Sequence, residues 1–337
     1  MAHTHEKSTV LTKVYSCKEE NEMQNTTKPG RGFVTMATGK DMYYRLAETL
    51  LLSYRLTTAN PLRFAILCDR ENKYTEAFDD VILLENPRNS YVDKLELLVR
   101  APYEETIFID ADCIAYTDLN EYWNYFENTT DLSCFGTVLP LDNTKSAWFT
   151  LAGAGRYADQ LSYLLEFHGG IYFIRRGDIC EEIYRISKDV IEHYSEFTFK
   201  IFDQPADEPA IAVGMALCGC KPVKRERRQY AFYSLTSFKK VDFFKKICVY
   251  DRLTKGMQGQ EGHVDDGMII HFGARHTISP LYTIEAAKVH FLNRHGRPWS
   301  IVEGFAFKFR AYAEYILRIS WRGLKRKLRK IRRSLLK

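Results

Sequence analysis

The chain has 337 residues, of which 45% are hydrophobic and 14% aromatic, and this is enough apolar side chain to bury a full core. A disordered or fibrous protein is therefore excluded. The formal net charge is only +5, but ten Lys and Arg residues and no acid lie from Arg318 to Lys337, so the tail carries the basic charge.

The first residues, MAHTHEKSTVLTKVYSCKEE, contain no apolar run of signal-peptide length. The longest apolar stretches, such as AIAVGMALC from Ala210, fall far short of the roughly 20 residues that a membrane-spanning helix needs. The eight cysteines include no C-x-x-C pair, which favours reduced thiols. We therefore expect a cytoplasmic protein that does not cross a bilayer.

Strands and helices alternate after a polar arm, residues 1–30, that ends in KPGRG. GFVTMAT predicts a strand, and DMYYRLAETLLLSYRLT predicts a helix with Leu46, Leu50 and Ser53 on one face and Asp41 as N-cap. LRFAILCD and DDVILLE predict short buried strands, SYVDKLELLVRAPY a helix closed by its proline, and ETIFIDADCIAY the next strand. This order predicts an α/β fold with a parallel, doubly wound sheet, whose ligands lie beyond the carboxyl ends of the strands.

The second half is less regular. GGIYFIRR and GMIIHFGA predict strands, and DEPAIAVGMALCG predicts a helix that Gly219 terminates.

Asp110 and Asp112 stand at the end of the apolar run TIFI. Residues i and i+2 of a strand project to the same face, so both carboxylates can point at one spot, which suits Mg²⁺ or Mn²⁺. His271 ends another short apolar strand, and an added imidazole favours Mn²⁺. In the alternative interpretation, Asp110 caps a turn, Asp112 is solvated and His271 is a core or turn histidine.

Five segments together resemble glycosyltransferase family 8, the glycogenin and bacterial galactosyltransferase group. They are GFVTMATGKDMYYRLAETLLLSYRL, DKLELLVRAPYEETIFIDADCIAYTDL, HGGIYFIRR, DEPAIAVGMA and IIHFGARH, in the family's order from about Gly32 to His276. The resemblance implies a GT-A fold, a Rossmann-like mixed sheet flanked by helices. It also implies Mn²⁺-dependent transfer of a sugar from a nucleotide diphosphate sugar with retention of anomeric configuration.

By this resemblance, Asp110, Asp112 and His271 hold Mn²⁺ (or Mg²⁺), and Ala111 lies with them against the nucleotide sugar. The metal stabilises the leaving phosphate as a Lewis acid.

The resemblance places the nucleoside at the loop MATGKDMYY, with the backbone of Ala37 and Thr38 at the base and Tyr43 stacked on it. Lys94 is directed at the donor phosphates or sugar. In the alternative, structural interpretation, Tyr43 is a helix residue that packs on the core, and Lys94 is a solvated helix residue.

The family pattern also puts Gly273 and Arg275 near the diphosphate, where a guanidinium binds phosphate well, although Arg275 could equally be a surface residue. Gly169 and Gly170 permit close backbone approach. His168 departs from the family pattern, because it stands where the family tends to have an asparagine that recognises the sugar.

Asp207 and Glu208 are the predicted catalytic residues. By the family resemblance, Asp207 matches an aspartate that contacts the donor sugar in glycosyltransferase family 8. Glu208 stands where that family commonly has glutamine. Glu208 could act as nucleophile or stabilise positive charge at the anomeric carbon. We favour attack of the acceptor on the same face of the sugar, in which the departing phosphate accepts the acceptor's proton. Asp203 and Gln204 could match the same two family positions in place of Asp207 and Glu208. In a purely structural interpretation, Asp207 and Glu208 form an acidic first turn that interacts favourably with the helix dipole.

The acceptor side gives little signal. Trp148, Phe149, Tyr157 and Asp159 fall where acceptor loops lie in this fold.

One apolar stripe runs along the predicted C-terminal helix, with basic residues around it. Its members are Leu317, Trp321, Leu324, Leu328, Ile331 and Leu335. Such a helix suits an anionic membrane surface, and the resembling bacterial enzymes end in a similar segment. The alternatives are a helix docked on the domain, a coiled-coil seam and a nucleic-acid tail. We expect no nucleic-acid partner, because no nucleic-acid-binding module precedes the tail.

We therefore expect an arm at 1–30, a GT-A domain at 31–276 and an extension at 277–337 whose residues 315–337 meet an anionic membrane. The predicted activity is transfer of a hexose, UDP-linked by resemblance, to a glycan or lipid-linked acceptor at the cytoplasmic face. The alternatives are an inverting enzyme with Asp207 or Glu208 as base, and a non-catalytic sugar-nucleotide-binding relative.

Overall fold

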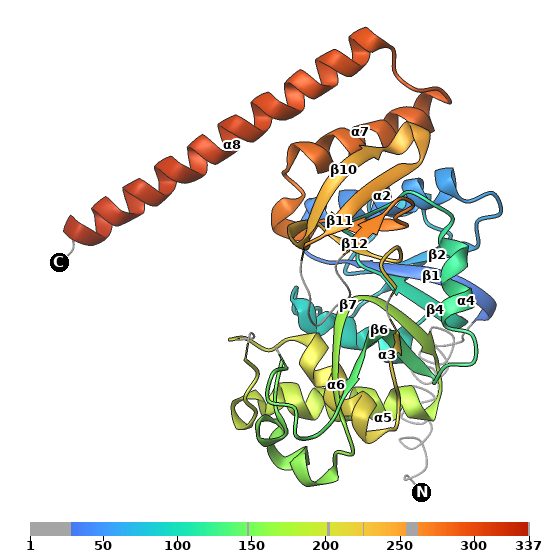
Figure 1. Cartoon of the computed structure of the whole chain (residues 1–337), viewed down its shortest axis with the longest axis vertical. Coiled ribbons are helices and arrows are strands. Elements are labelled where there is room, and N and C mark those ends of the chain that lie inside the picture. Colours follow the sequence, from blue (N-terminus) through green and yellow to red (C-terminus); the bar gives the residue numbers. More distant parts are fainter. Residues whose placement is uncertain (1–27, 147, 201–202, 225, 254–261, 336–337) are drawn as a thin grey trace, which may run out of the picture.

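The computed structural model describes residues 28–335 apart from 147, 201–202, 225 and 254–261, with side chains described as far as Trp321. Within these residues a seven-stranded sheet has the order β3-β2-β1-β4-β7-β6-β8 (Figure 1). The strands are β1 Lys28–Ala37, β2 Arg63–Cys68, β3 Asp80–Leu83, β4 Tyr103–Ile109, β6 Leu132–Leu139, β7 Leu164–Arg175 and β8 Val223–Lys224. Strands β1 to β4 pair in parallel, whereas β7 is antiparallel to both β4 and β6. The expected α/β mixed sheet flanked by helices is confirmed.

Helices lie on both faces of this sheet. The helices of the described chain are α2 Asp41–Thr57, α3 Leu97–Arg100, α4 Tyr122–Tyr125, α5 Asp178–Glu192, α6 Asp207–Leu217, α7 Pro280–His295 and α8 Ile301–Leu335, of which α8 does not cover the sheet (Figure 1). Successive strand residues point to opposite faces. Val34 and Phe108 pack in the core that contains α5 and α6, while Phe33 and Ile107 pack in the core that contains α2 and α4.

Two smaller sheets complete the described chain. Strands β10 Thr236–Asp242, β11 Ile247–Arg252 and β12 Gly262–Val264 form an antiparallel sheet. Strand β13 Ile269–His271 lies between β5 Cys113–Ala115, to which it is antiparallel, and β9 Ala231–Phe232, to which it is parallel. This last sheet joins segments that are more than a hundred residues apart in sequence.

Several local predictions need correction. Lys40, not Asp41, is the N-cap of α2, although Leu46, Leu50 and Ser53 are buried as expected. The helix expected over SYVDKLELLVRAPY is a 3₁₀ helix, Tyr91–Glu96, followed by the four-residue α3. Strand β3 is partly exposed, because it is the edge of the sheet.

The boundary predictions stand as follows. Strand β1 begins at Lys28, inside the expected arm, whose residues 1–27 lie outside the described residues. Gly219, with φ of +73°, follows α6 as expected, because glycine adopts this left-handed conformation without strain.

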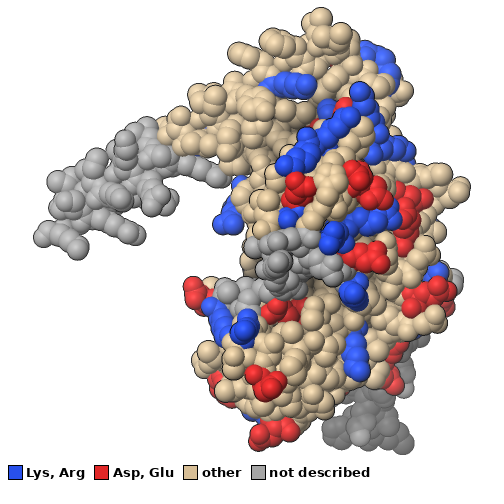
Figure 2. Space-filling model, in the orientation of Figure 1, with Lys and Arg blue, Asp and Glu red and all other residues tan. Residues whose placement is uncertain are grey.

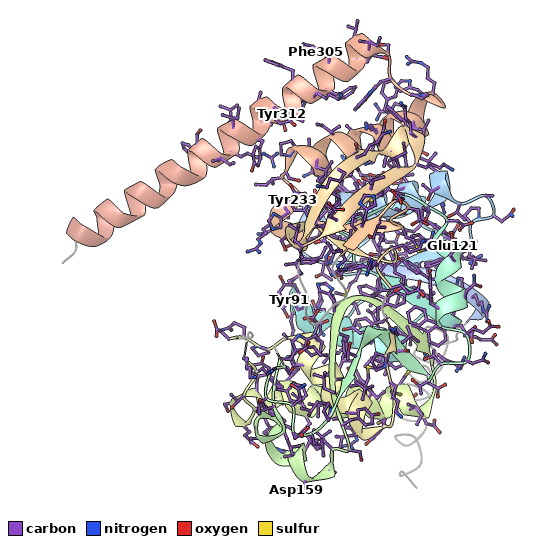
Figure 3. The ribbon with its side chains drawn as sticks, viewed as in Figure 1. Tyr91, Glu121, Asp159, Tyr233, Phe305 and Tyr312 are labelled. Carbon is purple, nitrogen blue, oxygen red and sulfur yellow. The ribbon has the colours of Figure 1, made fainter. Side chains whose placement is uncertain are left out.

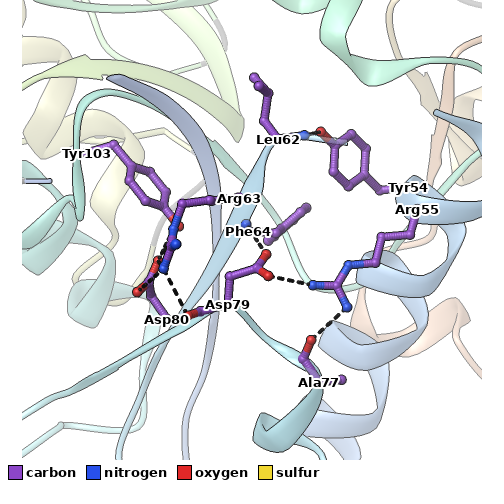
Figure 4. A network of polar contacts seen from close by, with 9 residues as sticks. All are labelled: Tyr54, Arg55, Leu62, Arg63, Phe64, Ala77, Asp79, Asp80 and Tyr103. Carbon is purple, nitrogen blue, oxygen red and sulfur yellow. Dashed lines mark hydrogen bonds and ion pairs between the residues drawn. The ribbon is translucent and has the colours of Figure 1, made fainter. Parts of the chain in front are cut away.

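A polar network ties the amino-terminal ends of the strands to α2 (Figure 4). Arg63 donates to the Asp80 carboxylate at 2.8 Å, and the Tyr103 hydroxyl donates to the same carboxylate at 2.8 Å. Asp79 accepts from the backbone of Phe64 at 2.8 Å and from Arg55 of α2 at 3.0 Å. These contacts fix the end of the sheet opposite to the carboxyl ends, where the site described below lies.

Helix α8 extends away from the domain (Figure 1). It meets α7 through the Phe307 ring, which stacks on Trp299 at a centroid distance of 5.0 Å and contacts Phe291 of α7. Among the described residues, no helix is both long enough and apolar enough to span a bilayer.

A buried ion pair joins α7 to the segment after β10. Lys288 donates to Glu285 at 2.7 Å and to Asp242 at 2.8 Å, and Glu285, which is 1% exposed, also accepts from the backbone of Phe243 at 2.7 Å. We expect Lys288→Met to lower the free energy of unfolding by about 3–5 kcal/mol, because it leaves the Glu285 carboxylate buried without its cation.

Urea unfolding of the full chain measures this change. The matched control is Arg310→Ala, which breaks an exposed ion pair with Glu314 and should change stability by less than about 0.5 kcal/mol. Equal unfolding midpoints for Lys288→Met and the parent would contradict the prediction.

Candidate functional site

Asp110 and Asp112 lie in the turn that links two different sheets. Strand β4 ends at Ile109, and β5, which begins at Cys113, belongs to the sheet that contains β13. The expectation that both aspartates belong to one continuous strand is therefore wrong. They still lie at the carboxyl end of β4, where ligands bind in sheets of this kind.

The pairing of β13 with β5 places His271 beside this turn. It stands opposite Cys113 in the antiparallel β13–β5 register, and the following backbone N–H, of Phe272, donates to Asp112 O at 3.1 Å. His271 Nε2 lies 2.8 Å from Asp112 Oδ1 and 3.7 Å from Asp110 Oδ2. The structure thus brings the three predicted metal ligands together.

Lys94 is buried beneath the turn and is not a solvated helix residue. Its Nζ lies 2.8 Å from Asp110 Oδ1 and 3.7 Å from Asp207 Oδ2, and it donates to the Gly169 carbonyl at 3.2 Å. One ammonium therefore links the end of β4, the middle of β7 and the start of α6.

Asp207 and Glu208 form the first turn of α6, against the backbone of β7. The Gly169 N–H donates to Glu208 Oε1 at 2.6 Å. A Cβ at Gly169 would stand only 2.9 Å from Glu208 Cγ, so this contact requires glycine. The competing pair, Asp203 and Gln204, is exposed before the helix, which favours the register with Asp207 and Glu208.

The acidic groups of the site have shifted pKa values. Burial, and then the charge of Asp207, raises the pKa of Glu208 to about 7, and burial also raises the pKa of Asp207. Burial alone would raise the pKa of Asp112, but His271 and Lys94 bring it below its ordinary value. Carboxylates outnumber cationic side chains in this cluster, so an added cation is favoured.

The residues fit a divalent metal. Asp112 Oδ1 is buried, and among the described residues no donor makes a well-aligned hydrogen bond to it, although His271 Nε2 lies 2.8 Å away. Carboxylate oxygen and imidazole nitrogen are ligands that suit Mn²⁺. The Cys113 sulfur also lies within 4.8 Å of the Asp112 and His271 ligand atoms, but burial raises the pKa of the Cys113 thiol well above 9, which keeps it protonated.

The loop after β1 lies at the same edge of the sheet. Ala37 is buried at the end of β1, Thr38 is half-buried after it, and Tyr43 is half-buried in α2, where it packs against the same core as Ala111. Tyr43 therefore belongs partly to the core, and its stacking role stays a prediction.

Two residues that were not predicted, Asp69 and Arg70, hold this loop. Asp69 accepts from the Gly39 N–H at 3.1 Å, and Arg70 donates to the Gly39 carbonyl at 2.7 Å and to Asp41 at 2.7 Å. Asp69 follows β2 directly, just as Asp110 follows β4, so an acid immediately after a buried strand was the available signal.

The other predicted binding residues lie around His271. Gly273 has φ of +65°, and the exposed Arg275 donates to the ring of His276 at 3.1 Å. A Cβ at Gly170 would stand 2.6 Å from the Tyr230 hydroxyl, so this glycine makes room for a side chain. Their contacts with a nucleotide sugar stay predictions.

The expected acceptor residues are not part of this site. Trp148 and Phe149 are each 1% exposed in the core, so a sugar cannot stack on them. Asp159 lies at the lower end of the molecule in Figure 3, well below Tyr91, which belongs to the same segment, Tyr91–Glu96, as Lys94 of the site. Tyr157 donates to Asp189 of α5 at 2.9 Å.

Tyr91 and Tyr230 of the site were not predicted, and His168 was noted only as a departure from the family pattern. Tyr91 is 68% exposed, and the charges of Asp110 and Asp112 act on its hydroxyl. His168 and Tyr230 contact His271 from β7 and from the residue before β9. No local pattern marks Tyr230, because only the pairing of β9 with β13 brings it to the site.

No protein-family model matches the chain, and no curated protein matches its sequence significantly. Similar solved structures include galactosyltransferase LgtC in complex with donor and acceptor sugar analogues, at 14% identity over 82% of this chain and 99% of that one, with a TM-score of 0.48. The bifunctional glycosyltransferase WbbM has 13% identity over 62% of this chain and 42% of its own, with a TM-score of 0.41. The glycosyltransferase GlyE of Streptococcus pneumoniae has 15% identity over 60% and 46%, with a TM-score of 0.38. This chain thus spans less than half of WbbM and GlyE.

The raised pKa of Glu208 predicts a pH-dependent stability. The folded protein keeps this proton to about pH 7 and the unfolded chain only to about 4.5, so the folded state binds more protons between these values and stability falls as pH rises through them. We expect Glu208→Gln, which keeps the acceptor for Gly169, to remove this decline and to stabilise the metal-free protein by on the order of 1–3 kcal/mol at pH 8.

Thermal or urea unfolding at pH 5 and pH 8 measures the difference. A stability gain of equal size at both pH values would show that Glu208 does not titrate in this window.

Proposed function

We propose that this protein is a metal-dependent glycosyltransferase that moves a hexose from a nucleotide diphosphate sugar to a glycan or lipid-linked acceptor. The observation that carries the proposal is the cluster at the carboxyl end of β4. There the side chains of Asp110, Asp112 and His271 lie close together. Lys94 pairs with Asp110 and with Asp207 in the first turn of α6. The sequence resemblance to glycosyltransferase family 8 supports the same activity.

Asp110, Asp112 and His271 would hold the metal ion. Such an ion, when bound, draws negative charge from the donor diphosphate as a Lewis acid and so eases departure of the nucleotide. The backbone at Ala37 and Thr38 would meet the base, and the donor would be UDP-linked by resemblance.

The protein's own groups would orient the donor sugar. Lys94 holds Asp110 and Asp207 in fixed positions, so the carboxylates need no rearrangement when the donor binds. Asp207 and Glu208 would face the sugar, where negative charge stabilises a developing positive charge at the anomeric carbon. We propose retention by same-face attack, in which the departing phosphate accepts the acceptor's proton.

One observation favours a second candidate, an inverting enzyme with Glu208 as general base. The pKa of Glu208, about 7, suits a group that accepts a proton at neutral pH. Anomeric analysis of the product by NMR separates the two, because retention and inversion give opposite anomers.

Asp112→Asn tests the catalytic proposal. Loss of one metal ligand should lower Mn²⁺-dependent transfer or donor hydrolysis by roughly 100-fold or more. The control is Asp142→Asn, which changes an exposed aspartate outside the cluster. A rate equal to that of the parent would rule out the metal-dependent mechanism, and donor binding without turnover in the parent would favour the non-catalytic relative.

We also propose that residues 315–337 associate with an anionic membrane at its cytoplasmic face. Large apolar side chains are exposed along the described part of α8, among them Ile316 at 61% and Leu317 at 68% within this segment and Tyr312 at 55% just before it, which Figure 3 labels. Figure 2 shows this part projecting from the body of the protein with few charged residues on the visible face. Leu324, Leu328, Ile331 and Leu335 of the predicted stripe lie outside the described side chains.

Vesicle sedimentation tests the membrane proposal. The full chain should bind vesicles with anionic lipid far more tightly than phosphatidylcholine vesicles, because each basic residue near an anionic surface contributes about 1 kcal/mol. Removal of residues 315–337 should abolish the difference. Equal binding by the full and shortened chains would contradict the proposal.

A further inference from the structure

Tyr230 joins two histidines at the centre of the site. It is 3% exposed, its hydroxyl oxygen lies 2.9 Å from His168 Nδ1, and the same oxygen contacts His271 Nδ1. The Gly170 backbone N–H reaches His168 Nδ1 at 3.1 Å from the other side. These contacts form a chain from the backbone of β7 to His271.

The backbone amide fixes the direction of this chain. An amide N–H can only donate, so His168 Nδ1 is an acceptor and carries no proton. The single proton of the Tyr230 hydroxyl must then point at His168 Nδ1, since two lone pairs would otherwise face each other at 2.9 Å. The Tyr230 oxygen is left to accept from His271 Nδ1–H.

The consequence concerns the opposite nitrogen of His271. A neutral imidazole with its proton on Nδ1 has its lone pair on Nε2, and this nitrogen faces Asp112 and Asp110. Because Nε2 lies 2.8 Å from Asp112 Oδ1, a second proton lies between them in the metal-free protein, and a metal ion can replace this proton while every other contact of the chain stays the same.

The position of Tyr230 is itself fixed. Its carbonyl accepts from the buried Arg252 at 3.1 Å, and the next residues form β9, whose Phe232 is in register with His271. The Phe232 and His271 rings lie 5.1 Å apart. Any side chain at Gly170 would collide with the Tyr230 hydroxyl.

We infer that Tyr230 is a positioning residue that keeps the proton of His271 on Nδ1 and so presents Nε2 to the metal. The inference rests on the metal site of the proposed function. It also gives Gly170 a role beyond close approach of backbone to a sugar, which is to leave room for the hydroxyl.

Tyr230→Phe tests the inference on the full chain. Groups that bond the far nitrogen of a ligating histidine typically contribute 10–100-fold to metal affinity, so we expect the Kd for Mn²⁺ alone, measured by the EPR signal of free Mn²⁺, to rise by roughly that factor. The matched control is Tyr250→Phe, which removes another buried hydroxyl, one that donates to the Arg227 carbonyl at 2.7 Å, and should leave this Kd unchanged.

Imidazole ¹⁵N NMR gives a readout that a merely structural role would not move. In the metal-free parent, the His271 resonances, assigned with His271→Gln, should show a proton on Nδ1 in addition to the one that Nε2 shares with Asp112. In Tyr230→Phe they should shift toward the Nε2–H tautomer that prevails in water.

An Nε2–H tautomer in the parent, or an unchanged Mn²⁺ affinity in folded Tyr230→Phe, would overturn the inference. Failure of the proposed function looks different. In that case the parent binds no Mn²⁺ while the tautomer still depends on Tyr230.

Discussion

The structure of the site depends on one buried ammonium. Lys94 lies between Asp110 at the end of β4 and Asp207 at the start of α6, and it also donates to the β7 backbone at Gly169. Without this cation, carboxylates from two elements would repel each other in a buried space. One positive charge still leaves the cluster acidic, so its electrostatics favour a further cation beside Asp112.

The sequence predicted the elements well wherever local pattern decides them. The alternation of apolar strands with helices placed β1, β2, β4 and α2, and their parallel pairing followed from the connecting segments. The antiparallel entry of β7 between β4 and β6 could not be predicted, because it depends on long-range pairing. For the same reason Asp110 and Asp112 were assigned to one strand, although the chain changes sheets between them.

The site was predicted in part. Asp110, Asp112 and His271 stand at the ends of short apolar runs, a signal that can be seen in sequence. Tyr230 has no such signal, since the β9–β13 pairing that brings it to His271 joins distant residues. Trp148 and Phe149 show the opposite error, because aromatic residues near a predicted loop are as readily core residues as sugar platforms.

Anomalous X-ray diffraction from crystals grown with Mn²⁺ and a nucleoside diphosphate tests the central claim most directly. We expect one strong manganese peak in contact with Asp110, Asp112 and His271, with Lys94 still paired to Asp110. A fully occupied manganese site elsewhere, with Asp112 and His271 paired only to each other, would contradict the metal-dependent mechanism.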